Sequence, residues 1–370
     1  QLLTEPDGRE TYIRESFGQR GLSMESILIT GGCGFIGSHF IRLLCAEEKF
    51  RVINLDKLTY AGNLENLSDV AGAFRFVRGD IGDRELVERI LQEENPWAVV
   101  NFAAESHVDR SILDAAPFLQ TNIGGVQTLL EAIRKVPVKR FLQVSTDEVY
   151  GDREGKDAAG EETVLCPSSP YAASKASADL LCMAYRRTHE LPILITRSSN
   201  NYGPFQFPEK LIPLCIRNAQ AGMKLPVYGD GGQIRDWIYV EDNCRAILAI
   251  LRGAEPGSVY NIGGVGERKN LDVVRAICSA VVTQTGQDPD KIESNIEFVA
   301  DRPGHDRRYA LRTEKIRREM GWSARTGFES GLDQTIRWYL SHPEWVARVT
   351  SGEYQQYYDS VYARTWGKPS

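Results

Sequence analysis

Three evenly spaced glycines follow a short apolar run near the start of the chain. Residues 27–30 read as a buried strand, Gly31, Gly34 and Gly37 come next, and apolar residues recur at helical spacing over 38–48. Glycine lets the chain turn tightly there and lets backbone N–H groups approach a pyrophosphate at the start of a helix. The pattern predicts a strand–turn–helix unit that binds a dinucleotide rather than a turn with no ligand.

Strands and helices alternate after this unit, which is typical of βαβ units in a parallel sheet. The predicted strands are 52–55, 74–77, 97–103, 140–145 and 192–196, and the predicted helices are 83–93, 115–134 and 171–189. We therefore predict an α/β fold whose residues 26–201 form a Rossmann-type, doubly wound parallel sheet.

The texture of the sequence changes after Asn200, where prolines and glycines become frequent. A chain of 370 residues is long enough for a second unit. We expect residues 202–370 to form a smaller, mixed α/β substrate domain. It would interleave with the first domain, because the apolar runs 237–240 and 259–262 within segment 236–264 can return to the sheet. Residues 1–25 carry scattered charges and no apolar signal core, and we expect a flexible leader.

The composition argues against several classes of partner. The net charge of −6 gives no basic excess for a nucleic-acid backbone. No apolar run approaches the ~18 residues that span a membrane. Seven cysteines without a C-x-x-C pair favour a reducing, cytoplasmic setting over a disulfide framework. Five histidines without a close pair suggest no metal site.

Acidic residues at the ends of the second and third strands indicate which dinucleotide binds. Asp56 closes the second strand, where a carboxylate can accept hydrogen bonds from both ribose hydroxyls of adenosine. It would repel a 2′-phosphate, so NAD is favoured over NADP, although the neighbouring Lys57 softens this preference. Asp80 and Ile81 end the third strand, where the edge of the adenine could be contacted.

A tyrosine and a lysine four residues apart lie on one face of the helix predicted over 171–189. A nearby ammonium, here Lys175, and a cationic nicotinamide both favour the phenolate of Tyr171, so we expect its pKa to lie below ~10. Such a phenolate can take a hydroxyl proton while a hydride leaves to NAD. Ser145 or Thr146, after the preceding strand, could hydrogen-bond the same oxygen. An ordinary surface pair is the alternative.

Longer strings place these motifs in a known family. The glycine turn with Tyr171 and Lys175 resembles the extended short-chain dehydrogenases/reductases. Further strings are similar to one group of them, the dTDP-glucose 4,6-dehydratases: LDKLTYAGN at 55–63, AAESHVDRS at 103–111, STDEVYG at 145–151, SNNYGP at 199–204, PEKLIP at 208–213, QIRDW at 233–237 and DRPGHDRRY at 301–309. The resemblance covers nearly the whole chain from residue 27.

Two adjacent acids, Asp147 and Glu148, favour a dehydratase within this family. They follow a predicted strand at a point where the chain turns, so both can point into one cleft. Elimination of water needs an acid and a base, and two carboxyls with different pKa values can share these roles. The resemblance implies Asp147 as the acid, Glu148 as the base, and Thr146, Tyr171 and Lys175 as further catalytic residues. Related epimerases usually lack the pair.

The resemblance also implies the binding residues. For the cofactor they are Gly31, Gly34, Phe35, Ile36, Gly37, Asp56, Lys57, Thr59, Asp80, Ile81, Ala103, Ala104, Tyr171, Lys175 and Asn201. For the substrate they are Ser106, His107, Thr146, Asn200, Lys210, Leu211, Pro226, Tyr228, Arg235, Asn270, Arg302 and His305. The cations Lys210, Arg235 and Arg302 suit a diphosphate. For His107 a structural role is the alternative.

The activity implied is dehydration of dTDP-glucose to dTDP-4-keto-6-deoxyglucose. It would proceed by C4 oxidation with bound NAD, loss of water across C5 and C6, and hydride return to C6. UDP-glucose in place of dTDP-glucose is the first alternative, because no motif reads the base. A nucleotide-sugar 4-epimerase and an NAD-binding non-enzyme are the others. The resemblance further implies a homodimer that packs helices 115–134 and 171–189 in a four-helix bundle.

Overall fold

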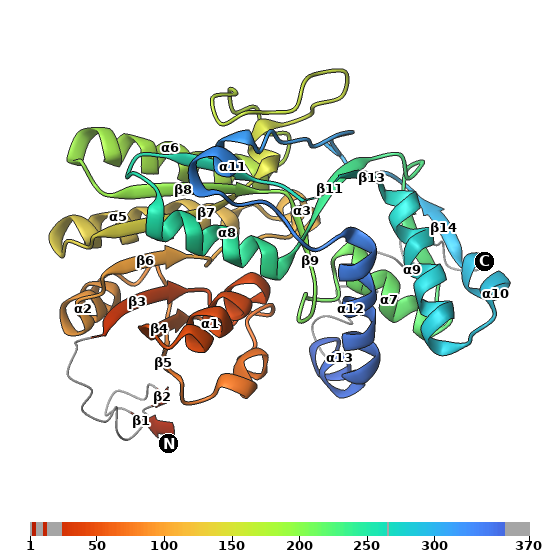
Figure 1. Cartoon of the computed structure of the whole chain (residues 1–370), viewed down its shortest axis with the longest axis horizontal. Helices are drawn as coiled ribbons and strands as arrows, with labels where there is room; N and C mark the ends of the chain where they lie inside the picture. The colour runs from red at the N-terminus through yellow and green to blue at the C-terminus, as the bar shows by residue number, and fades with distance from the viewer. Residues whose placement is uncertain (1, 5–9, 13–23, 265, 352–370) are drawn as a thin grey trace.

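A large, mostly parallel sheet forms the centre of the molecule (Figure 1). The structure, a computed structural model, describes residues 2–4, 10–12, 24–264 and 266–351. Across these residues the strand order is β1-β2-β5-β4-β3-β6-β7-β8-β12. The strands are β1 Leu2–Thr4, β2 Glu10–Tyr12, β3 Glu25–Thr30, β4 Phe50–Asp56, β5 Phe74–Arg78, β6 Ala98–Asn101, β7 Arg140–Thr146, β8 Ile193–Ser198 and β12 Val259–Ile262.

The stretch from β5 to β12 is parallel throughout, which confirms the predicted doubly wound sheet. Its central strands are apolar on both faces because helices cover both sides. Along β3, Ile27 and Ile29 pack into one core, whereas Leu28 points into the other. The observed strands lie within a few residues of the predicted ones.

Helices α1 (Phe35–Glu47) and α8 (Val240–Gly253) cover one face of the sheet (Figure 1). Helices α2 (Arg84–Glu94), α5 (Val126–Lys135) and α6 (Pro170–His189) cover the other face. The start of α6 follows from local chemistry: the Ser169 hydroxyl accepts a hydrogen bond from the N–H of Ala172, and Pro170 occupies the first turn.

The helix predicted over 115–134 is present, but its winding changes along its length. It begins as α4 (Ala116–Phe118), widens into the π-helical segment η2 (Leu119–Gly125) and continues as α5. Gly125 lies in the widened part, and a Cβ there would stand 2.5 Å from Cδ1 of Ile81. The absence of a side chain at Gly125 therefore lets this helix approach the segment after β5.

The second half of the chain builds its own core beyond the carboxyl ends of the large sheet (Figure 1). It contains two small sheets, β9-β11-β13 and β10-β14, and several helices. These elements are β9 Asn200–Tyr202, α7 Leu211–Gln220, β10 Leu225–Tyr228, β11 Ile234–Tyr239, β13 Glu267–Lys269, α9 Asn270–Thr285, α10 Pro289–Glu293, β14 Ile296–Val299, α12 Phe328–Ser341 and α13 Pro343–Val349. Helix α11 (Glu314–Met320) packs against the large sheet instead, with Ile316 in its core.

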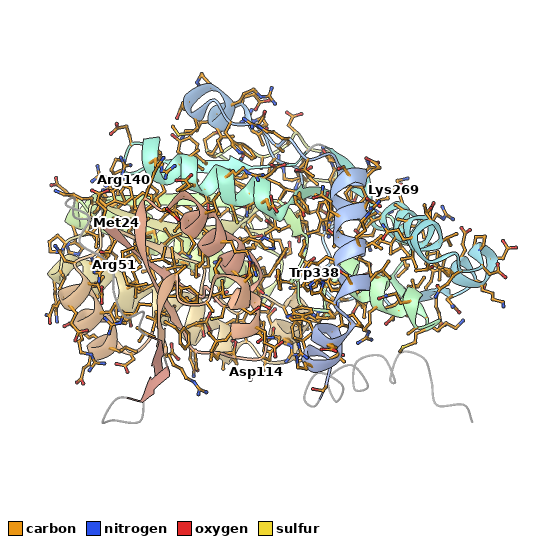
Figure 2. All side chains as sticks on the ribbon, turned by 60° about the horizontal axis from the view of Figure 1, so that its bottom comes forward. Met24, Arg51, Asp114, Arg140, Lys269 and Trp338 are labelled. Carbon is orange, nitrogen blue, oxygen red and sulfur yellow. The ribbon has the colours of Figure 1, made fainter. Side chains whose placement is uncertain are left out.

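Short elements complete the connections: η1 Leu64–Val70, α3 Val108–Leu113 and η3 Asp147–Tyr150. The two halves touch through an aromatic cluster. Trp338 projects from α12 (Figure 2), and the centre of its ring lies 4.4 Å from the centre of the Phe205 ring. The guanidinium of Arg42, on α1, lies 4.2 Å from the centre of the same phenylalanine ring. The Trp345 indole donates to Asn66 Oδ1 at 2.9 Å.

One expectation about the return of later segments to the large sheet needs correction. Of the two runs expected to return to the large sheet, 259–262 does so as β12, but 237–240 does not. The strand that holds Trp237, β11, pairs with β9 instead, since β9 lies beyond the end of β8 and Trp237 packs against the Tyr202 ring there.

Of the predicted flexible leader, residues 1–25, the segments 1, 5–9 and 13–23 lie outside the described residues. Leu2–Thr4 and Glu10–Tyr12 are strands, and β2 pairs antiparallel with β5. The physical reason is that the outer edge of β5 offers backbone groups that another strand can satisfy. Within the described residues, no helix is long and apolar enough to cross a membrane.

Candidate active site

A cavity lies at the carboxyl edge of the parallel sheet, where β3, β4, β5 and β6 end. Loops at this edge surround it, as expected for a ligand site in a doubly wound sheet. Every residue predicted for the cofactor lines it except Asn201, whose side-chain amide donates to the carbonyl of Ser199 at 3.0 Å. Among the other predicted residues, Ser106 and Lys210 also line it.

The glycine turn packs so closely against neighbouring backbone that side chains would not fit at Gly31 and Gly37. Gly31 has φ +70°, a conformation that favours glycine, and a Cβ there would stand 2.5 Å from the backbone nitrogen of Ala103. A Cβ on Gly37 would stand 2.4 Å from the carbonyl oxygen of Gly31. Gly34 caps α1, whose first turn contains no acidic residue. The N–H groups at this helix start are therefore suited to hold a pyrophosphate.

Asp56 lies at the end of β4 and fixes the same turn. Its two carboxylate oxygens accept hydrogen bonds of 2.8 Å from the backbone N–H groups of Cys33 and Leu58. Burial raises the pKa of Asp56, and these two bonds oppose the rise. Each oxygen has a second lone pair, which leaves acceptor capacity for ribose hydroxyls. Lys57 forms an ion pair with Asp80 at 2.7 Å, and this pair partly neutralises the charge of Lys57 beside the cavity.

Tyr171 and Lys175 both face the cavity from α6. Burial, and then the charges of Glu148 and Asp147, raise the pKa of Tyr171, while a hydrogen bond from Thr146 opposes them. The expected lowering of this pKa is therefore wrong for the protein alone. The Lys175 ammonium donates to the carbonyl of Val144 at 2.7 Å, and burial lowers the pKa of Lys175 to about 8.

The acid pair lies in η3, directly after β7. Asp147 is 3% exposed, its Oδ1 accepts a hydrogen bond of 3.2 Å from the Thr146 hydroxyl, and its Oδ2 has no partner within the described residues. Burial, followed by the charge of Glu148, raises the pKa of Asp147 well above its usual value. Burial also raises the pKa of Glu148, whereas Arg302, Arg235 and Lys210 lower it. The two carboxyls thus differ in their surroundings.

Several residues predicted for the substrate are held by hydrogen bonds to Asp109 or to one another. Arg302 donates to Asp109 Oδ1 at 3.2 Å, and the Tyr228 hydroxyl donates to Asp109 Oδ2 at 3.0 Å. Lys210 donates to the carbonyl of Ser106 at 2.7 Å. Among the described residues, buried polar atoms without a protein partner include Asn200 Oδ1, Asn270 Oδ1 and Arg302 Nε. Such atoms suit a polar ligand, because a buried polar group left unpaired is costly.

The other residues predicted for the substrate take part in the folded structure itself. Arg235 donates to the carbonyl of Asp306 at 2.8 Å and lies over the Tyr309 ring. His305 bonds to Asp301 at 2.6 Å. His107 caps α3 by accepting from the N–H of Arg110 at 3.4 Å, which fits the structural alternative. Leu211 begins α7 and Pro226 lies in β10.

Sequence reasoning missed several lining residues of the cavity. They come from elements far apart in the chain: Leu55, Ala61, Gly62, Phe102, Glu105, Thr121, Val144, Gln206, Phe207 and Glu209. Leu55, Ala61, Gly62, Glu105 and Glu209 fall inside the quoted strings, which was a usable signal. Thr121, Gln206 and Phe207 reach the cavity only through tertiary packing.

The chain is similar to characterised proteins over almost all of its length. Residues 28–335 match the family described as GDP-mannose 4,6 dehydratase. The dTDP-glucose 4,6-dehydratases of Xanthomonas campestris and Shigella flexneri are 50% and 49% identical, over 90% and 91% of this chain and 98% of each relative. The crystal structure of the Bacillus anthracis dTDP-glucose 4,6-dehydratase in complex with NAD superposes with a TM-score of 0.80 at 45% identity, covering 88% of this chain and 99% of that one. The glycine turn, the Tyr171/Lys175 pair and the acid pair thus occur together in a chain that belongs to the dTDP-glucose 4,6-dehydratase family.

Proposed function

We propose that this chain dehydrates dTDP-glucose to dTDP-4-keto-6-deoxyglucose, with NAD as a bound cofactor that is regenerated in each cycle. The observation that carries the proposal is the grouping of Tyr171, which lines the cavity, with the carboxyls of Asp147 and Glu148, whose charges act on it. The charge of each carboxyl raises the pKa of the tyrosine, so the three proton-carrying groups lie close enough to serve one substrate.

The residues around the glycine turn fit NAD. The helix start at Gly34 suits the pyrophosphate and Asp56 suits the ribose of adenosine. When bound, NAD supplies the acceptor for a hydride from the sugar C4 and later its donor to C6. Tyr171 and Lys175 line the same cavity, where they would face the reacting sugar.

Each of the three proton-carrying groups has one task in the cycle. The positive charges of Lys175 and of the nicotinamide ring, when NAD is bound, would favour the phenolate of Tyr171, which takes the proton from the C4 hydroxyl. The new C4 ketone acidifies the C5 proton, which Glu148 removes. Asp147, whose raised pKa keeps a proton available, protonates the C6 hydroxyl so that it leaves as water. Glu148 then returns the proton to C5, and Tyr171 loses a proton while Asp147 regains one, which restores all three groups for the next cycle.

The cations and unpaired polar atoms support a diphosphate-sugar substrate. Arg302, Arg235 and Lys210 all act on Glu148 electrostatically, so they lie around the same region. Arginine can hold two phosphate oxygens at once, and lysine acts as a point charge. The unpaired Asn200 and Asn270 oxygens would accept hydrogen bonds from sugar or ribose hydroxyls.

The experiment incubates the purified chain with dTDP-glucose, and separately with UDP-glucose, without added NAD. Mass spectrometry follows the loss of one water from the nucleotide sugar. Loss from dTDP-glucose alone is the expected result. Loss from UDP-glucose alone would contradict the base preference but keep the mechanism. If neither sugar reacts after NAD is added, the dehydratase proposal is wrong, and the 4-epimerase becomes the first alternative.

A homodimer and a cytoplasmic location are further parts of the proposal. Leu119 on η2 and Leu180 and Met183 on α6 are apolar and exposed, at 51%, 56% and 38%. Exposed apolar side chains on two contacting helices support a four-helix contact between two copies. Sedimentation should give twice the monomer mass, and Leu180→Glu should shift it towards the monomer.

The free cysteines support a reducing compartment.

A further inference from the structure

A buried acidic residue that the mechanism does not use lies beside the cavity. Glu209 precedes α7, and its side chain is only 3% exposed although the residue lines the cavity. Its Oε1 accepts a hydrogen bond of 3.1 Å from the hydroxyl of Tyr60. Its Oε2 accepts one of 3.3 Å from Nε of Arg110. Three segments from distant parts of the chain therefore meet at one carboxylate.

Tyr60 is held on more than its hydroxyl. The Arg110 guanidinium lies 4.0 Å from the centre of the Tyr60 ring, and the Phe207 ring meets it edge-on at 5.4 Å. The contact between Arg110 and the tyrosine is a cation–π interaction. We call the set formed by Tyr60, Arg110, Phe207 and Glu209 the clasp.

The clasp joins two segments that both line the cavity. Thr59, Ala61 and Gly62, on either side of Tyr60, line the cavity within the loop that follows β4. Phe207 and Glu209 line it from the segment before α7. Separating these two segments would break the Tyr60–Glu209 bond.

The charges argue against a direct role for Glu209 in ligand binding. A free carboxylate at this place would repel a pyrophosphate. Glu209 avoids this because its charge is paired with that of Arg110 within the clasp. Both oxygens of the carboxylate already accept protein donors. The side chain is thus built to hold the two segments together.

From this geometry we infer that the clasp retains NAD: the Tyr60–Glu209 hydrogen bond keeps the loop after β4 closed over the bound cofactor between turnovers. The inference rests on the proposed function, because a cycle that reduces and reoxidises the same cofactor gains nothing from releasing it. Tyr60 and Glu209 are positioning residues, since neither needs to touch the reacting atoms.

The test measures the exchange of bound NAD for isotopically labelled NAD, with the nucleotide in the protein fraction analysed by mass spectrometry after rapid gel filtration. Tyr60→Phe removes the hydroxyl and keeps the ring. A hydrogen bond to a charged group is strong enough that its loss should speed exchange about tenfold. Glu209→Gln weakens the same bond and should also speed exchange.

The matched control is Tyr260→Phe. Tyr260 lies on β12 and does not line the cavity, and its hydroxyl donates a hydrogen bond of 2.8 Å to Glu319. It should exchange NAD at the wild-type rate. The double variant Tyr60→Phe/Glu209→Gln should exchange more slowly than the product of the two single effects predicts, because both remove one interaction.

Three results would overturn the inference: wild-type exchange in Tyr60→Phe, equal acceleration in the Tyr260→Phe control, or single effects that simply multiply. Failure of the proposed function has a different signature. A wild-type chain that neither carries NAD nor takes up the labelled NAD would overturn both. A chain that exchanges NAD normally but dehydrates no sugar would overturn the dehydratase proposal and leave the clasp standing.

Discussion

The Lys175 ammonium donates a 2.7 Å hydrogen bond to the backbone carbonyl oxygen of Val144, on the strand that leads to the acid pair. This bond anchors the side chain of Lys175 to β7, while its backbone belongs to α6. The ammonium is therefore held in a fixed position on the helix that also carries Tyr171.

The ionisation of Lys175 should appear in the pH dependence of the first step. Burial lowers its pKa to about 8, and the Asp179 charge opposes this. The ammonium is present below about pH 8 and is lost above it, so the rate of C4 oxidation should fall as pH rises through that value. Stopped-flow absorbance of the reduced cofactor measures this rate. Lys175→Met should be slower by about 10²-fold and should not show the fall; a fall that persists in the variant would assign it to another group.

Removal of the acid should separate the two halves of the reaction. Asp147→Asn keeps Tyr171 and Lys175, so C4 oxidation should proceed while turnover falls by about 10²- to 10⁴-fold. Reduced cofactor should then accumulate on the protein, detected by its absorbance. Tyr171→Phe is the matched comparison: it should lose turnover to a similar degree without accumulating reduced cofactor. Full turnover in Tyr171→Phe, or no accumulation in Asp147→Asn, would contradict the respective assignment.

The same Asp147→Asn change should stabilise the fold at neutral pH. The folded-state pKa of Asp147 lies well above its usual value because of burial. Such a group favours the folded state when protonated, and this contribution is lost as pH rises from the unfolded value towards the folded one. Asparagine carries no charge at either pH, so the free energy of unfolding of the variant should exceed that of the wild type by at least ~1 kcal/mol at pH 7 and by little near pH ~4. Denaturant unfolding at the two pH values measures it. The exposed change Asp157→Asn should show no such difference, and an equal gain at both pH values would contradict the explanation.

The buried ion pair that joins α6 to β8 should be essential for stability. Arg197 and Asp179 are 2% and 0% exposed and lie 2.8 Å apart. Asp179→Asn leaves the guanidinium without its counter-charge and should cost about 3–5 kcal/mol in urea unfolding. The exposed pair of Arg337 and Asp333, 2.9 Å apart, offers the control: Asp333→Asn should cost at most about 1 kcal/mol. Equal costs at the two sites would show that burial does not decide the effect.

Much of the cofactor site could be predicted because its residues are close together in the sequence. Gly31, Gly34 and Gly37 follow one strand, and Asp56 ends the next strand. Parallel strands bring such ends to one edge, so the cavity position follows from local patterns. Tyr171 and Lys175 lie four residues apart on one helix, where the helical repeat alone puts them on the same face.

Packing between distant segments decided the rest. The direction of the Tyr171 pKa depends on burial and on Glu148, which approaches through the turn after β7. The partner of β11 depends on where β9 leaves the end of β8. Tyr60 and Glu209 are separated by almost half the chain, and nothing in either string indicates that they meet.

The sequence by itself therefore determined the doubly wound sheet, the glycine turn and the identity of the groups that carry protons, because these depend on short-range periodicity and on residue chemistry. Only the tertiary structure decided how acidic those groups are and which segments close the cavity. The physical reason is that burial and the charges across a cavity depend on residues distant in the chain, such as Arg302 near Glu148 and Glu209 near Tyr60.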